Sequence, residues 1–264
     1  ADLLRQYYNS EDLDESIKIN NQRFVKKNEN ALVAHLYYFD LLPELLSLIE
    51  RNVNLDAFIT IPVHFSREQV GEILASLDNV YVLRVQNRGR DILPFLNIYP
   101  IIKSYSYANL VKVHSKKSPQ RADGALLRKR ALLELLDPSI VPGVLRALNT
   151  DPKIGLIAPS NSLCSLSNSD YLINNRKQLN YCLSRLGLVD SSLNFEFIAG
   201  SMFWARVDAL RMLSDLSLRE EDFEEELGQL DGTLAHAIER LFCFLGKHVG
   251  YRTLPVDQIG ISVA

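Results

Sequence analysis

Residues 80–91 read VYVLRVQNRGRD, and much of the chain repeats the pattern of this segment. Apolar, β-prone residues from Val80 to Val85 predict a buried strand, and the glycine-centred turn Asn87–Asp91 follows it at once. Comparable apolar runs lie at 31–39, 57–62 and 110–113, and segments with helical spacing lie at 42–50, 66–77 and 92–102. Because near-continuous apolar strands alternate with helices, we expect β-α-β crossovers and an α/β fold with a mainly parallel central sheet flanked by helices.

The second half of the chain is less regular. Helices are predicted at 124–136 and 139–149, strands at 154–158 and 250–255, and a loop rich in Ser and Asn at 159–170. Residues 195–206 predict β structure that breaks at Gly200, and Asp231 is placed to cap the start of a helix. At the helix over 66–77, Ser66 and Gln69 match a capping box.

The domain organisation follows from these segments. The polar start of the chain predicts a leader or linker helix over residues 1–30. We find no internal repeat and no boundary further on, so residues 31–264 are predicted to form one domain. The chain begins with Ala1 and has no initiator Met, so we expect it to be a piece of a longer protein with other domains.

The composition excludes several classes of protein. Of the 264 residues, 47% are apolar and 23% are charged, which rules out wholesale disorder. The formal charge of −3 lacks the basic excess of a nucleic-acid coat or a polybasic membrane binder. No apolar run approaches the ~20 residues of a membrane span. Cys164, Cys182 and Cys243 are widely spaced, which argues against a disulfide scaffold or structural zinc and fits core residues in a reducing compartment.

Polar and aromatic side chains follow the first four predicted strands, at the edge where open parallel sheets bind their ligands. These strand ends are Tyr37–Asp40, 62–64, Asn87–Asp91 and His114–Ser118. The aromatic residues at the first of these ends suit a base, and the glycine turn with Arg and Asp suits a sugar. The His and two Lys at the last end suit a diphosphate. A diphosphate leaving group needs its charge neutralised by a metal or by fixed cations. The alternative is that Gly89 only supplies a positive φ and that the charged side chains are solvated.

Other candidate residues also have two interpretations. Asp231 suits a general base toward a hydroxyl, or a helix N-cap worth ~1 kcal/mol. Trp204, the only Trp, suits a sugar ring or the core, and the acids at 221–226 suit a base or a solvated face. His236 falls inside a predicted helix, where a packed or capping role is the simpler interpretation.

Familiar catalytic motifs are absent from the sequence. There is no Walker loop, GxGxxG, GxSxG or HExxH. The single Asp-x-Asp is Asp12-Leu13-Asp14, which lies in the polar leader and follows no strand.

The sequence resembles the rhamnan synthesis protein F family of bacterial cell-surface polysaccharide assembly. The resemblance runs in order over residues 31–255 and is carried by segments His35–Tyr38, Asn87–Phe95, Lys112–Ser118, Ile154–Pro159, Gly200–Arg206 and Asp231–Arg240. It implies a glycosyltransferase, which extends a rhamnose-containing or related polysaccharide such as a lipopolysaccharide O-antigen. The layout also resembles the GT-A glycosyltransferase fold, with a nucleotide-binding half and an acceptor half. Where many such enzymes carry a metal-binding Asp-x-Asp, this chain has His114-Ser-Lys-Lys.

We therefore predict a glycosyltransferase domain that moves a sugar, with rhamnose as a candidate, from a nucleoside-diphosphate donor to a growing glycan or lipid-linked glycan, with inversion. Asp231 is the predicted catalytic base. The predicted donor-binding residues are Tyr37, Asp40, Asn87, Arg88, Arg90, Asp91, His114, Lys116 and Lys117. The predicted acceptor-binding residues are Gly200, Ser201, Trp204 and Glu239. We predict no metal ligands and no cofactor, although a divalent metal stays open, and we expect no nucleic-acid partner.

Two other functions stay open at this stage. One is a non-catalytic glycan-binding or scaffolding module of a larger assembly protein, which would keep Trp204 but need no diphosphate site. The other is a phosphate-ester or diphosphate hydrolase. The expected location is the cytoplasm, with the inner face of the bacterial membrane as an alternative.

Overall fold

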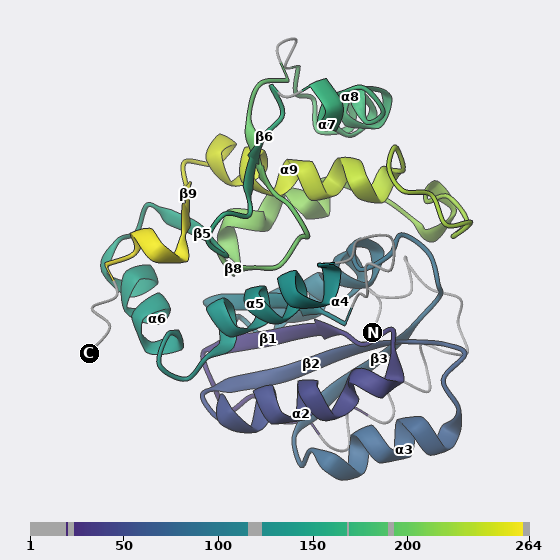
Figure 1. The fold of residues 1–264 in the computed structure, drawn as a ribbon, viewed down its shortest axis with the longest axis vertical. Coiled ribbons are helices and arrows are strands. Elements are labelled where there is room, and N and C mark those ends of the chain that lie inside the picture. The colour runs from purple at the N-terminus through teal and green to yellow at the C-terminus, as the bar shows by residue number, and fades with distance from the viewer. Residues whose placement is uncertain (1–19, 21–23, 116–122, 168, 190–192, 261–264) are drawn as a thin grey trace.

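The computed structural model describes residues 20, 24–115, 123–167, 169–189 and 193–260 (Figure 1). The strands are β1 (Asn30–His35), β2 (Leu55–Pro62), β3 (Val80–Val85), β4 (Asn109–His114), β5 (Ile154–Ala158), β6 (Leu163–Ser165), β7 (Glu196–Ile198), β8 (Phe203–Arg206) and β9 (Arg252–Pro255). The α-helices are α2 (Leu42–Arg51), α3 (Arg67–Ser76), α4 (Ile92–Ser104), α5 (Gly124–Leu136), α6 (Val141–Thr150), α7 (Ser169–Leu172), α8 (Arg176–Arg185) and α9 (Leu234–His248). The 3₁₀ helices are η1 (Phe39–Leu41), η2 (Asp208–Leu216), η3 (Glu220–Asp222) and η4 (Val256–Gln258).

The central sheet has the strand order β3-β2-β1-β4-β8-β5-β9. Strands β3, β2, β1 and β4 are parallel, and β5 and β9 are parallel to each other. Strand β8 lies between these two groups and runs antiparallel to both of its neighbours. The predicted α/β fold with a mainly parallel sheet is therefore confirmed.

Helices cover both faces of the sheet, as Figure 1 shows. Neighbouring residues of one strand point to opposite faces, so Leu32 joins the core under α2, α3, α5 and α6, whereas Val33 joins the core under α4, η2 and α9. Helix α8 lies beyond α9 and adds Leu179 and Cys182 to the core under α4, η2 and α9. No described helix is both long enough and apolar enough to cross a membrane.

The start of α3 confirms the predicted capping box. Ser66 Oγ accepts a hydrogen bond from the backbone N–H of Gln69 at 3.3 Å, and Gln69 Oε1 accepts one from the backbone N–H of Ser66 at 2.9 Å. Two of the orphan donors at the helix start are thus satisfied by local sequence alone.

Two predictions for the second half were wrong. The segment 159–170 is not loop throughout, because β6 pairs with β7 there and α7 begins at Ser169. Helix α9 begins at Leu234 with Thr233 as its N-cap, so Asp231 does not cap it. Thr233 is the N-cap because it forms a capping box with His236. Its backbone N–H donates to His236 Nδ1 at 3.3 Å, and its side chain accepts from the backbone N–H of His236.

Two described residues of the predicted leader pack on the sheet. The Asn20 side chain exchanges hydrogen bonds of 2.7 and 2.8 Å with the backbone of Val82 in β3. The ring of Phe24 lies 4.9 Å from that of Phe58 in β2. The division into 1–30 and 31–264 stays a prediction.

Candidate functional site

Two histidines lie side by side at the carboxyl ends of the parallel strands. His35 of β1 and His114 of β4 are register partners, and Thr60 of β2 is the partner of His35 on the other side. His35 Nδ1 lies 2.9 Å from Thr60 Oγ1. Burial lowers the pKa of His35 to about 4, so the ring is neutral at pH 7.

A lysine is buried beneath this edge of the sheet. Lys112 of β4 is 1% exposed, and its Nζ donates to Asp91 Oδ2 at 2.6 Å, to Ser201 O at 2.9 Å and to Ser201 Oγ at 3.0 Å. These three bonds use all the donors of the ammonium group. The Ser201 hydroxyl in turn donates to Asp91 Oδ2. Asp91 and Ser201, predicted as donor- and acceptor-binding residues, are thus buried partners of Lys112.

The turn between β7 and β8 joins the two halves of the sheet at this point. His114 Nε2 lies 2.7 Å from the carbonyl oxygen of Gly200, which can only accept, so Nε2 carries the proton. The backbone N–H of Gly200 donates to Glu239 Oε1 of α9 at 2.7 Å. Gly200 has φ +85° and Ser201 has φ +51°, and this left-handed turn presents both backbone groups in the required directions.

A cavity of about 540 Å³ opens on this turn. His114, Gly200 and Glu239 line one side of it, and the basic residues of α5 line another. Among the described lining residues the charged side chains are Arg90, Arg128, Arg130, Arg240, Glu134 and Glu239. We call this cavity the cleft. Its volume lies in the range of small-molecule sites, and its excess of arginines favours an anionic ligand.

The predicted donor-binding residues are split by the structure. Arg90 and His114 line the cleft. Tyr37 and Asn87 meet elsewhere on the strand-end edge, at 3.4 Å between Asn87 Nδ2 and the Tyr37 hydroxyl. Asp40 is exposed in η1 and is not part of the described cleft lining. Lys116 and Lys117 lie outside the described residues.

Arg88 points to a different partner. Its guanidinium donates to the carbonyl oxygens of Glu220 and Phe223 and to the carboxylate of Glu225, each at 3.4 Å. Within the described residues, Arg88 is not part of the cleft lining. Arg88 instead holds the segment after η3 against the Asn87–Asp91 turn.

Gly89 in this turn cannot be replaced without strain. Its φ is +62°, and an added Cβ would lie 2.6 Å from both Leu93 Cβ and Phe223 Cδ1. We expect Gly89→Ala to lower the free energy of unfolding by at least ~2 kcal/mol, measured by urea denaturation. The matched control is Gly71→Ala in α3, where nothing lies within 4 Å, and which should stabilise the protein by ~0.5–1 kcal/mol. Equal effects of the two substitutions would contradict this account of the turn.

Asp231 is engaged by other side chains. Its carboxylate accepts from Asn175 Nδ2 at 2.8 and 2.9 Å and from Arg240 Nη2 at 3.1 Å. Arg240 lines the cleft, whereas Asp231 is not part of the lining that the described residues form. Asp231 therefore holds Arg240 in place from behind.

Trp204 does not reach the cleft. It is fully buried in β8, and its Nε1–H donates to Leu135 O of α5 at 2.8 Å. The prediction that its face stacks on a sugar was wrong, because the strand's alternation turns this side chain into the core under α5.

Sequence reasoning missed Lys112 and the basic residues of α5 as parts of the site. Lys112 carried a signal, since a lysine inside the apolar run of β4 is costly to bury unless it is paired. Arg128 and Arg130 carried none, because exposed cations are ordinary on a helix. No group of three or more His, Cys, Asp or Glu residues in the described segments is arranged to hold a metal, and the prediction of no metal ligands stays a prediction.

Open α/β sheets with a cleft at the strand ends form a class of proteins that commonly bind small molecules in that cleft. The particular family is evident from comparison with known proteins. Residues 9–251 match the family described as Rhamnan synthesis protein F, and the chain belongs to this family. Membership links the chain to the synthesis of polysaccharide.

Two curated relatives agree with this assignment. Both carry the description "Uncharacterized protein WxcX", which names no activity, and they come from two strains of Xanthomonas campestris pv. campestris. Each is 39% identical to this chain over 234 residues, which is 88% of this chain and 33% of the relative. The chain thus spans about a third of the length of these relatives.

Proposed function

We propose that this chain is a glycosyltransferase domain that moves a sugar, with rhamnose as the first candidate, from a nucleoside-diphosphate donor to a growing cell-surface polysaccharide. The observation that carries the proposal is the cleft of about 540 Å³ next to the carboxyl end of β4, which is lined by arginines together with His114 and Glu239. Cations suit the diphosphate of the donor, and a carboxylate suits the acceptor hydroxyl.

The layout of the sheet supports a GT-A-like arrangement. The parallel strands β3-β2-β1-β4 with their helices resemble a nucleotide-binding half, and β8, β5 and β9 with α9 follow as a second half. Both halves contribute residues to the cleft lining, since His114 ends β4 and Glu239 lies on α9. An enzyme that joins two substrates needs both halves at one site.

The proposed reaction is a single displacement. The acceptor oxygen forms a bond to the anomeric carbon, the bond from that carbon to the diphosphate oxygen breaks with its electron pair, and a base takes the acceptor proton. We assign the base to Glu239 in preference to Asp231, because Glu239 lines the cleft and Asp231 is paired with Arg240 and Asn175. A single displacement of this kind inverts the configuration at the anomeric carbon.

The alternative of a non-catalytic glycan-binding module loses its main support. That interpretation relied on Trp204 and the other aromatic residues as a sugar platform, and Trp204 is fully buried. No other observation favours it over transfer.

Calorimetry with a panel of nucleoside-diphosphate sugars tests the proposal. We expect one donor to bind with a Kd of roughly 1 μM–1 mM, and to be consumed only when a glycan acceptor is present. NMR of the product should show the inverted anomer, and a parallel reaction with EDTA measures any metal requirement. Absence of binding by every donor would favour the module, and donor turnover without acceptor would favour a hydrolase.

A further inference from the structure

The basic residues of α5 form a part of the cleft to which no function was assigned above. Arg128 and Arg130 both line the cleft, and both come from α5. Arg130 is exposed and pairs with Glu134 one turn along the helix, at 2.7 Å. Arg128 is different, because its side chain is only 11% exposed.

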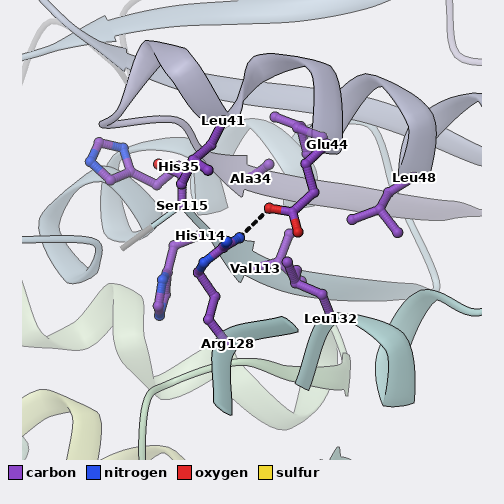
Figure 2. Close-up of a pocket in the computed structure, with 11 residues that line it drawn as sticks. Ala34, His35, Leu41, Glu44, Leu48, Val113, His114, Ser115, Arg128 and Leu132 are labelled. Carbon is purple, nitrogen blue, oxygen red and sulfur yellow. Dashed lines mark hydrogen bonds and ion pairs between the residues drawn. The ribbon is translucent and has the colours of Figure 1, made fainter. Parts of the chain in front are cut away.

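Arg128 lies between two hollows of the molecule. Figure 2 shows it reaching from α5 toward Glu44 on α2, with His114 at its side, around a small void of about 20 Å³. The Nη1 group pairs with the Glu44 carboxylate, and Leu41, Leu48 and Leu132 are the apolar neighbours. Arg128 also lines the large cleft, so one guanidinium borders both spaces.

The pairing of Arg128 is incomplete. Its Nε is buried and has no hydrogen-bond partner among the described residues. A buried N–H without an acceptor costs about 1–3 kcal/mol, which lowers the cost of turning this side chain toward a new acceptor. The cleft, which Arg128 also lines, gives room for that movement.

Glu44 can give up the pair at low cost. It lies in the first turn of α2, where the helix dipole favours a carboxylate, and it is about one-third exposed. The two carboxylates in the described cleft lining already accept hydrogen bonds from other groups. Glu134 accepts from Arg130 and from the N–H of Ser160, and Glu239 accepts from the N–H of Gly200. An anion that enters the cleft thus meets guanidinium groups with spare donors.

We propose that Arg128 and Arg130 bind the diphosphate of the donor, and that Arg128 does so by exchanging the Glu44 carboxylate for phosphate oxygens. A guanidinium binds two oxygens of a phosphate side by side, which a single lysine cannot do. The identity of the ligand rests on the proposed function, whereas the anion site itself does not.

Titration calorimetry with inorganic diphosphate tests this site without any sugar or acceptor. Arg128→Gln should raise the Kd by ~10-fold or more, and Arg130→Gln should raise it by a smaller factor. Glu44→Gln should have the opposite sign and lower the Kd by ~3–10-fold, because Arg128 then has no competing carboxylate. A purely structural Arg128–Glu44 pair predicts no gain of affinity in Glu44→Gln.

The control is Arg211→Gln, which removes an arginine from an exposed ion pair with Asp208 on η2, outside the described lining of the cleft. It should leave the Kd unchanged. If Arg128→Gln does not fold, the diphosphate Kd values of Arg130→Gln and Glu44→Gln test the proposal, since both positions are more exposed than Arg128. Absence of diphosphate binding in the unaltered chain, or weaker binding in Glu44→Gln, would overturn the proposal. Sugar transfer with unaltered diphosphate affinity in Arg128→Gln would overturn this site and leave the proposed function standing.

Discussion

Replacing Lys112 by methionine is expected to lower the free energy of unfolding by about 3–5 kcal/mol, which is the cost of leaving one charge of a buried ion pair without its partner. Lys112 neutralises Asp91 and satisfies both the carbonyl and the hydroxyl of Ser201. Methionine removes all three donors and also the ammonium group that lies over the ring of Phe95, so the Asp91 carboxylate stays buried without its cation. Urea denaturation monitored by circular dichroism measures the loss.

The control for Lys112 is Lys103→Met at an exposed position of α4, which should change stability by less than about 0.5 kcal/mol. Adding Asp91→Asn to Lys112→Met should recover part of the loss, because a neutral amide no longer needs the ammonium group. A loss below about 1 kcal/mol for Lys112→Met would contradict the proposed dependence of Asp91 on Lys112.

Replacing Glu239 by glutamine is expected to slow sugar transfer by roughly 10²–10⁴-fold, the usual contribution of a general base. The amide oxygen of glutamine can still accept the hydrogen bond from the Gly200 N–H, so the turn keeps its shape. What is lost is the ability to hold the acceptor proton. Initial rates with the donor identified by calorimetry measure kcat, and the donor Kd should stay within about threefold.

Two variants separate the base from its neighbours. Glu134→Gln changes the other carboxylate of the cleft, whose oxygens already accept from Arg130 and the Ser160 N–H, and it should slow transfer far less. Asp231→Asn tests the base predicted from sequence. If Asp231→Asn abolishes transfer and Glu239→Gln does not, the assignment to Glu239 is wrong and the sequence prediction stands.

The fold was predictable because its signals are local. The apolar runs of the first four strands and the spacing of α2, α3 and α5 each report on a few neighbouring residues, and the parallel sheet follows from their alternation. Helix α8 was missed because it is polar apart from a few residues, such as Leu179 and Cys182, that pack toward α9. Packing against α9 is what stabilises this segment as a helix.

The candidate site was predictable only in part. The strand-end rule led to Arg90 and His114, and the Gly200 and Glu239 positions also line the cleft. The same rule grouped Tyr37 and Arg88 with them, but these side chains bond to Asn87 and to the segment after η3. Sequence order says which residues follow a strand, but not toward which neighbour each side chain turns.

The amino-acid sequence by itself determined the α/β class, the order of the strands and α-helices from β1 to α6, the capping box of α3 and the family. These depend on periodicity and on short motifs, which act within one or two turns of chain. Only the tertiary structure decided that Lys112 is a buried counter-ion, that Trp204 belongs to the core and that Arg128 borders the cleft beside Glu44. Each of these roles depends on which distant segment supplies the opposite charge or the covering layer, and that is decided when the sheet and its two helical layers pack together.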